Sequence, residues 1–104
     1  MRTLEGRVAV VTGAGSGIGR ATSVELARHG CRLALVDRDA DAAHATAALL
    51  PATAHPSVHQ ADVRDADRIA ELPDEVVDVH GGVHVLMNNA GVTSAGKFED
   101  ESVD

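Results

Sequence analysis

The chain has 104 residues, of which 44% are hydrophobic, and its 16 acidic and 9 basic residues give a net charge of −7. This length allows one domain at most, and the negative charge argues against binding to the phosphate backbone of nucleic acids. The apolar runs are too short to span a membrane, and the first residues lack the apolar core of a signal peptide. A single cysteine excludes an internal disulfide and suits a reducing compartment, so we expect a cytoplasmic protein.

Short β-branched runs alternate with longer helical patterns, which is typical of βαβ units around a parallel sheet. Strands are predicted at about 7–12, 31–36, 57–61 and 83–87. Helical spacing covers about 17–29, 39–50 and 66–80. Pro73 falls inside the last of these segments, and it predicts a kink or two short helices because proline lacks a backbone donor.

The most informative stretch is 7–19, which reads RVAVVTGAGSGIG. It predicts a strand, a turn with glycines at positions 13, 15, 17 and 19, and the start of a helix. Such a turn brings bare backbone N–H groups and the positive end of a helix dipole to an anion. We therefore predict that it holds the pyrophosphate of a dinucleotide.

The spacing of the glycines separates the nucleotide-binding families. The GxGxxG pattern fails because Ile18 stands at its third glycine, and the phosphate loop of nucleoside triphosphatases fails because the first lysine is Lys97. A GxGxG pattern fits the first three glycines and is found in methyltransferases that use S-adenosylmethionine. Those proteins usually have an acid two residues before the first glycine, where this chain has Val11. This alternative is weakened but stays open.

The remaining spacing, TGxxxGxG over residues 12–19, resembles the fingerprint of the short-chain dehydrogenase/reductase family. Three further matches follow in the right order after the second, third and fourth strands: Asp37, Asp62-Val63, and Asn88-Asn89-Ala90-Gly91. The resemblance covers about residues 4–91. It implies an α/β fold, a Rossmann-like doubly wound parallel sheet that is incomplete here, with strand order 3-2-1-4 and helices on both faces.

The resemblance also implies a set of cofactor-binding residues: Gly13, Ser16, Gly17, Ile18, Gly19, Asp37, Arg38, Asp62, Val63, Asn89, Ala90 and Gly91. Gly13 permits the tight turn, Gly17 lets the ligand approach the backbone, and Gly19 permits close packing of helix on strand. Ser16 and Ile18 offer backbone N–H groups, and Ser16 also a hydroxyl group.

Asp37 lies about 20 residues beyond the glycine turn, where a carboxylate accepts hydrogen bonds from the adenosine ribose. A carboxylate there repels a 2′-phosphate and favours NAD over NADP, although the neighbouring Arg38 can pair with that phosphate. The resemblance places Asp62 at the adenine amino group and Val63 at the ring face, and an ordinary turn aspartate is the alternative. The resemblance implies that the motif at 88–91 both stabilises the sheet and lines the cofactor pocket.

The family's chemistry is hydride transfer assisted by a tyrosine whose pKa is lowered by a lysine four residues on. This chain has no tyrosine and only one lysine, Lys97, so no catalytic residue is assigned and its status as an enzyme stays open. No metal site is expected, because the histidine pairs at 55/59 and 80/84 lack further ligands.

Two functions follow from these observations. In the first, residues 1–104 form one NAD(P)-binding domain, the cofactor-binding half of an NAD-dependent dehydrogenase acting on an alcohol or ketone, truncated before its catalytic half. In the second, the chain is a free-standing, non-catalytic nucleotide-binding module. A sheet that ends at the fourth strand exposes an edge, so we expect self-association. Apart from the dinucleotide, neither nucleic acid nor membrane is an expected partner.

Overall fold

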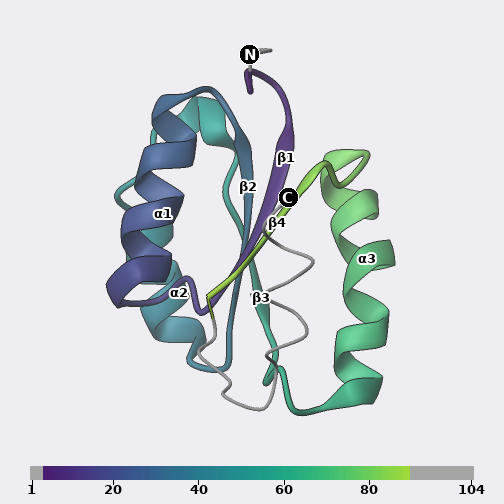
Figure 1. The fold of residues 1–104 in the computed structure, drawn as a ribbon. Helices are drawn as coiled ribbons and strands as arrows, with labels where there is room; N and C mark the ends of the chain where they lie inside the picture. Colours follow the sequence, from purple (N-terminus) through teal and green to yellow (C-terminus); the bar gives the residue numbers. More distant parts are fainter. Residues whose placement is uncertain (1–3, 90–104) are drawn as a thin grey trace.

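The computed structural model describes residues 4–89 as a parallel sheet with helices on both faces (Figure 1). In chain order the elements are β1 (Val8–Thr12), α1 (Gly17–Arg28), β2 (Arg32–Asp37), α2 (Ala40–Ala47), a short 3-10 helix (Ala52–Ala54), β3 (Ser57–Gln60), α3 (Ala66–His80) and β4 (Val85–Asn88). The strand order is β3-β2-β1-β4, and all neighbouring strands are parallel. The predicted Rossmann-like fold class and strand order are confirmed.

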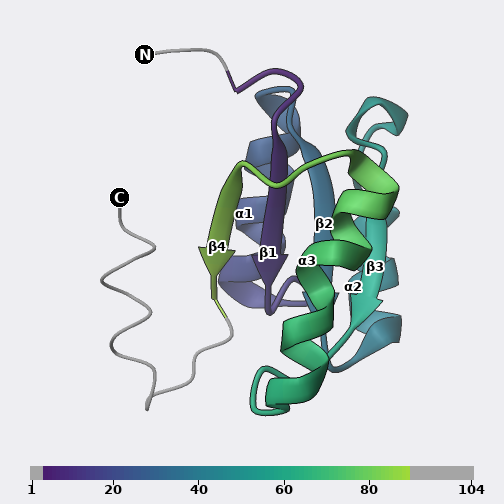
Figure 2. The ribbon, with the colours of Figure 1, turned by 90° about the vertical axis from the view of Figure 1, so that its right-hand side faces the viewer.

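The two central strands have uninterrupted buried apolar runs, 8–11 in β1 and 33–36 in β2, because helices cover both of their faces. Successive side chains of a strand point to opposite faces, so β1 contributes to two separate cores. Ala9 and Val11 pack with the cluster under α1 and α2, while Val8 and Val10 pack with the cluster under α3. Figure 2 shows α3 lying across β1, β2 and β3 on its side of the sheet. Together the two cores fix the sheet between its helical layers.

The end of α2 differs from the sequence prediction. The helix stops at Ala47, three residues before the predicted end at Leu50, and the chain continues through tighter hydrogen bonds from Leu49 N–H to Thr46 O and from Leu50 N–H to Ala47 O. The residue before a proline is disfavoured in helical conformation, so the chain unwinds as it approaches Pro51. The segment after this proline forms the short 3-10 helix.

Helix α3 runs through Pro73 as one element, so the predicted division into two helices is wrong. Proline costs a backbone hydrogen bond within a helix. Here the buried face continues on both sides of it, with Leu72, Val76 and His80 all less than a tenth exposed. Packing of this face against the sheet outweighs the lost bond, while Pro73 itself stays on the exposed side.

A buried polar network joins α3 to β3. The hydroxyl oxygen of Ser57 lies 2.7 Å from His59 Nε2 and 2.9 Å from His80 Nε2. The other ring nitrogen of His59 bonds to the Glu75 carboxylate, which also accepts two hydrogen bonds from Arg68. Both histidines are almost fully buried. The helix is therefore attached to the edge strand by polar as well as apolar contacts.

The charge of Glu75 determines which atom of His59 donates a proton to it in this network. Hydrogen bonds from Arg68, and then from His59, lower the pKa of Glu75 to about 2, so its carboxylate is ionised and His59 Nδ1 is a donor. The Ser57 hydroxyl has a single proton, so it can donate to only one of the Nε2 atoms of His59 and His80, and the other Nε2 must donate to the Ser57 oxygen. Burial lowers the pKa of His80, and the nearby positive charge of Arg32 adds to this effect.

We expect the protein to lose stability as the pH falls below about 6.5, because the unfolded chain then binds a proton that folded His80 resists. A further loss follows below about 4.5, as Glu75 takes up a proton in the unfolded state before the folded state. Urea denaturation between pH 8 and pH 3 measures both steps. His80→Gln should flatten the first step, whereas His44→Gln, at an exposed position, should leave it unchanged. A wild-type profile that is flat between pH 8 and pH 5 would contradict this assignment.

Candidate functional site

The candidate site lies at the carboxyl edge of the sheet, where the predicted motifs meet. From β1 the chain moves outward to β2 and β3, then returns to pair β4 with the other side of β1. Ligands of open α/β sheets bind at such a switch point, beyond the carboxyl ends of the strands. Figure 2 shows the arrowheads of β1 and β4 pointing to the same edge.

The glycine turn between β1 and α1 is built on a very close contact. A Cβ atom on Gly19 would lie 1.9 Å from the carbonyl oxygen of Gly13, which no side chain tolerates. Gly19 therefore has the packing role that the sequence predicts. At Gly17 the backbone has a φ of +56°, and a Cβ atom there would meet nothing within 4 Å. The backbone at Gly17 is thus open to an approaching group.

Helix α1 begins differently from the other two α-helices of the described chain. Its N-cap residue Ser16 makes no side-chain hydrogen bond to the helix, and its first turn has no acidic residue. By contrast, Asp39 and Asp65 cap α2 and α3 and accept a backbone N–H in each case. The first N–H groups of any helix lack internal acceptors. At α1 neither the N-cap side chain nor an acidic residue of the first turn satisfies them, and Ile18 beside them is 74% exposed.

Two residues that the sequence analysis did not identify hold the carbonyl groups of this turn. Thr46 in α2 donates its hydroxyl proton to Ala14 O at 2.8 Å. Arg20 in α1 donates to Gly15 O at 2.7 Å and to Thr46 Oγ1 at 2.9 Å. A Cβ atom on Gly15 would lie 2.6 Å from the Cβ atom of Ala42. In the sequence, only Gly15 could have indicated that α2 packs closely on this turn, because the TGxxxGxG fingerprint does not require a glycine at this position.

Asp37 ends β2 and contacts the glycine turn directly. One carboxylate oxygen accepts the Gly15 N–H at 2.8 Å, and the other accepts the Asp39 N–H at 2.9 Å. These two bonds fix the carboxylate in one orientation. The structure therefore brings together the residue predicted for the ribose and the turn predicted for the pyrophosphate.

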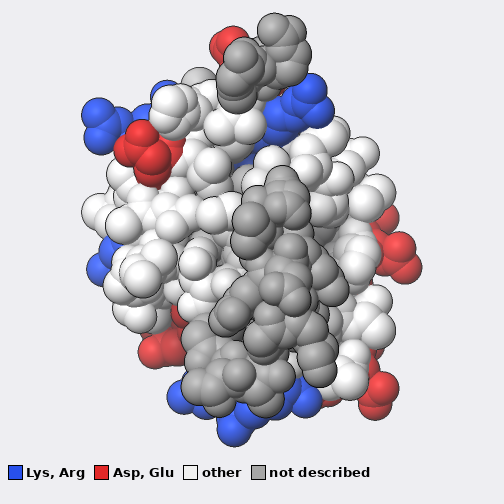
Figure 3. Space-filling model, in the orientation of Figure 1, with Lys and Arg blue, Asp and Glu red and all other residues white. Residues whose placement is uncertain are grey.

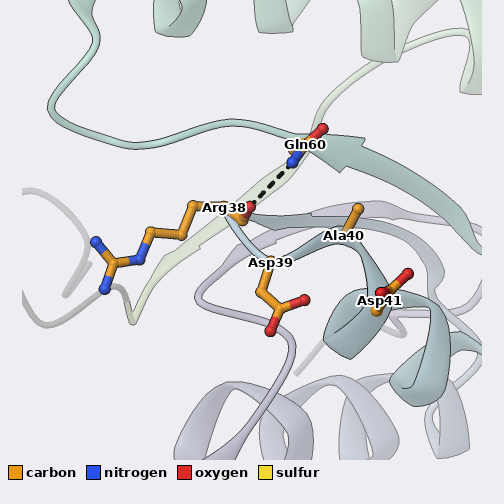
Figure 4. A pocket seen from close by; sticks show the side chains of 5 residues that line it. All are labelled: Arg38, Asp39, Ala40, Asp41 and Gln60. Carbon is orange, nitrogen blue, oxygen red and sulfur yellow. Dashed lines mark hydrogen bonds between the residues drawn. The ribbon is translucent and has the colours of Figure 1, made fainter.

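Next to Asp37, an open hollow of about 520 Å³ lies between the ends of β2 and β3 (Figure 4). Its lining residues are Arg38, Asp39, Ala40, Asp41 and Gln60. The side-chain amide of Gln60 donates to the backbone oxygen of Arg38 at 3.1 Å and closes one side. In Figure 4 the guanidinium group of Arg38 extends away from the carboxylates of Asp39 and Asp41. It is therefore available to other groups at this edge.

Asp62 and Val63 lie in the turn between β3 and α3, as predicted. Arg64 binds the Asp62 carboxylate through its side chain, at 2.8 Å and 3.1 Å, and through its backbone N–H at 2.9 Å. These hydrogen bonds lower the pKa of Asp62, with a smaller contribution from the charge of Arg38. Figure 3 shows basic side chains gathered at this lower end of the molecule, although the chain as a whole is acidic.

The end of β4 is tied to the end of β1 through Thr12. Its hydroxyl donates to Asn88 Oδ1 at 2.9 Å and accepts the backbone N–H of Asn89 at 2.9 Å. The sheet-stabilising part of the predicted motif is thus present. The side-chain nitrogen of Asn89 is buried and makes no hydrogen bond within the described chain. Ala90 and Gly91 lie outside the described residues.

A family model described as short chain dehydrogenase matches residues 7–104. The chain belongs to the short-chain dehydrogenase/reductase family. The matched residues include all four sequence motifs, so the family model supports the resemblance that their spacing indicated.

Curated relatives of this short-chain dehydrogenase chain are longer than it is. An uncharacterized short-chain type dehydrogenase/reductase of Sinorhizobium fredii is 42% identical over 104 residues, which cover 95% of this chain and 41% of the relative. Trihydroxynaphthalene reductase of Pestalotiopsis fici is 37% identical over 100 residues, which cover 94% of this chain and 36% of the reductase. The chain thus spans 36–41% of the length of these two proteins.

Solved structures of the family superpose closely on the fold. A short chain dehydrogenase of Mycobacterium paratuberculosis bound to NAD has a TM-score of 0.79 at 32% identity, covering 88% of this chain and 39% of its own. A metagenomic short-chain oxidoreductase in complex with NADP has a TM-score of 0.78 at 39% identity, and the match covers 88% of this chain and 42% of the oxidoreductase. The family thus includes proteins bound to either dinucleotide.

Within residues 4–89, no group of three or more histidine, cysteine, aspartate or glutamate side chains is arranged to hold a metal ion. His84, which the sequence pairs with His80, has a structural role instead, because its Nδ1 accepts the Val8 N–H at 2.9 Å. No helix of this part of the chain is long and apolar enough to cross a membrane.

We expect Gly19→Ala to destabilise the protein by about 1–3 kcal/mol or more, because its methyl group would overlap the Gly13 carbonyl group. Helix propensity alone predicts the opposite sign, since alanine is favoured over glycine by about 1 kcal/mol inside a helix. Gly82→Ala is the control, as its Cβ atom would meet only His84 at an ordinary 3.5 Å. Chemical denaturation measures both, and a Gly19→Ala variant as stable as wild type would rule out the close contact.

Proposed function

We propose that this chain is the NAD-binding portion of an oxidoreductase that transfers hydride between NAD and an alcohol or ketone. The proposal rests on the arrangement of two neighbouring groups. Helix α1 begins without a side-chain cap, and the Asp37 carboxylate accepts the N–H of Gly15 in the turn directly before that helix. An uncapped helix start favours a pyrophosphate, and a fixed carboxylate beside it favours a ribose diol. One hydrogen bond of 2.8 Å links the two groups.

The residues present fit this cofactor. The turn Gly13–Gly19 would hold the pyrophosphate through the N–H groups of Ser16, Gly17 and Ile18. Asp62 and Val63 would meet the adenine, for which the Asp62 carboxylate keeps free lone pairs beside Arg64. Near the end of β4, Asn89 has a buried side-chain donor available, and we propose that Ala90 and Gly91 line the pocket with it.

When bound, the dinucleotide supplies the hydride chemistry, and this chain binds and orients it. No residue of the chain is assigned the proton transfer, because the chain has no tyrosine. We propose that the chain is the cofactor-binding half of a longer, cytoplasmic enzyme, and its coverage of 41% of one relative's length supports this. The missing tyrosine equally favours a second candidate, a nucleotide-binding module without catalysis.

NAD is proposed over NADP because a carboxylate that binds the adenosine ribose, as we propose for Asp37, would repel a 2′-phosphate on that ribose. Two like charges at hydrogen-bonding distance repel each other strongly in a partly buried site. Arg38, the next residue in the chain, carries an opposing positive charge, and its guanidinium extends away from Asp39 in Figure 4. We propose that the Asp37 carboxylate outweighs this charge, because two hydrogen bonds fix it in place.

We expect NADH to bind at least tenfold more tightly than NADPH, and S-adenosylmethionine not to bind, in calorimetric titrations of the chain. Asp37→Asn should remove the repulsion and bring the two affinities close together, while Asp37→Ala should weaken NADH most. Asp41→Asn is the matched control, since it removes a charge near the hollow without touching the turn.

Equal affinities for NADH and NADPH that Asp37→Asn leaves unchanged would contradict the ribose assignment. Binding of S-adenosylmethionine in place of NADH would instead favour the methyltransferase-like alternative. NADH binding by a natural full-length protein of this length, without turnover, would favour the non-catalytic module.

Self-association is proposed through β4, which is an edge strand of the described sheet. Its Leu86 is 50% exposed on the side where β1 contributes Val10 to the core under α3. An edge strand with an exposed apolar residue is a template for pairing with another chain. We expect sedimentation velocity to show concentration-dependent association that Leu86→Lys reduces. A monodisperse wild-type monomer with a sharp unfolding transition would contradict this expectation.

A further inference from the structure

The glycine turn must be rigid if its N–H groups are to bind a ligand. Glycine has the greatest backbone freedom of all residues, and a turn with several glycines loses more entropy on ordering than an ordinary turn. A mobile turn would weaken binding by the cost of ordering it each time. Something in the fold must therefore hold the turn in advance.

We propose that Arg20 and Thr46 are positioning residues, which hold the glycine turn so that its N–H groups point at the cofactor. This inference rests on the proposed dinucleotide site. Arg20 and Thr46 come from two different helices, and their side chains meet at the hydrogen bond of 2.9 Å between Arg20 Nε and Thr46 Oγ1. Thr46 is fully buried, so its bonds do not compete with bulk water.

Thr46 acts through the peptide group between Ala14 and Gly15. Its hydroxyl holds the carbonyl end of this peptide at 2.8 Å, and the Asp37 carboxylate accepts the N–H end at 2.8 Å. The C=O and N–H of a trans peptide are rigidly coplanar and point in opposite directions. Thr46 thereby sets the direction of the hydrogen bond that orients Asp37, the residue proposed for the ribose.

Arg20 acts in the same way on the next peptide group. Its guanidinium holds the carbonyl oxygen of Gly15 at 2.7 Å, so the N–H of Ser16 at the other end of that peptide points away from the guanidinium. A charged donor on the carbonyl also polarises the peptide and strengthens its N–H as a donor. This N–H is among those proposed to bind the pyrophosphate.

The close approach of α2 makes both contacts possible. Because Gly15 lacks a side chain, the Cβ atom of Ala42 in α2 can lie only 2.6 Å from the position that a Cβ atom of Gly15 would take. Thr46, one helical turn beyond Ala42, then reaches the turn carbonyls. Gly15 therefore has a role of its own, although it lies outside the family fingerprint.

The test compares ligands with and without a pyrophosphate. We expect Arg20→Met to weaken NADH about tenfold while adenosine, which has the ribose and base alone, changes less than twofold. Thr46→Val, which keeps the shape but loses the hydroxyl, should weaken NADH about tenfold, and Thr46→Ser should restore it. Arg28→Met is the control, because Arg28 is an exposed arginine on the same helix whose one ion pair is 3.9 Å long.

Amide hydrogen exchange measured by NMR on the ligand-free protein gives a second readout. Thr46→Val should speed exchange of the Gly15 amide about tenfold while the amides of β1 keep their rates. If Thr46→Val also speeds exchange throughout β1, the variant has lost its fold, and Arg20→Met and Thr46→Ser then decide.

The outcomes separate the positioning role from the proposed function. Wild-type NADH affinity in Arg20→Met and Thr46→Val, with unchanged Gly15 exchange, would overturn the positioning role and leave the cofactor site standing. If wild type binds no NADH, the proposed function fails. In that case faster Gly15 exchange in Thr46→Val still supports the rigid turn, and unchanged exchange overturns it.

Discussion

The structure depends on the contact between Gly19 in the first turn of α1 and the carbonyl oxygen of Gly13 at the end of β1. A Cβ atom at position 19 would lie only 1.9 Å from this oxygen, so no residue with a side chain fits there. It places the first turn of α1 directly against the turn that follows β1. The uncapped N–H groups of the helix and the carboxyl end of the central strand therefore lie at the same place, which is the condition for an anion site in this fold.

The close packing of α1 against the glycine turn also explains how a chain of net charge −7 can present the proposed anion site. The proposed site is made mainly from backbone N–H groups, whose partial charges act over a short range and do not depend on the net charge. Carbonyl oxygens of the turn are held inward by Arg20 and Thr46, which leaves the N–H ends of those peptides to face outward or toward Asp37. Arg20 also adds a positive charge where the carbonyl groups converge.

Much of the fold could be predicted because local patterns determine it. Continuous apolar runs and helical spacing gave the element types and their order, and the glycine spacing gave the family. The unbroken helix through Pro73 could not be predicted in this way, since packing on both sides of the proline decides it. The roles of Arg20 and Thr46 were also hidden, because their contacts join residues 26 and 32 positions apart that no local spacing relates.

The role proposed for Asp37 depends on contacts that its place in the sequence does not reveal. An aspartate at the end of a strand is ordinarily free to rotate, and its charge would then be only loosely placed. Here the N–H groups of Gly15 and Asp39 each hold one of its oxygens, so the carboxylate has a single orientation before any ligand arrives. Discrimination between a ribose hydroxyl and a phosphate requires such a fixed charge, because a mobile carboxylate could turn away from the phosphate. The proposed preference for NAD thus depends on the whole turn and not on Asp37 alone.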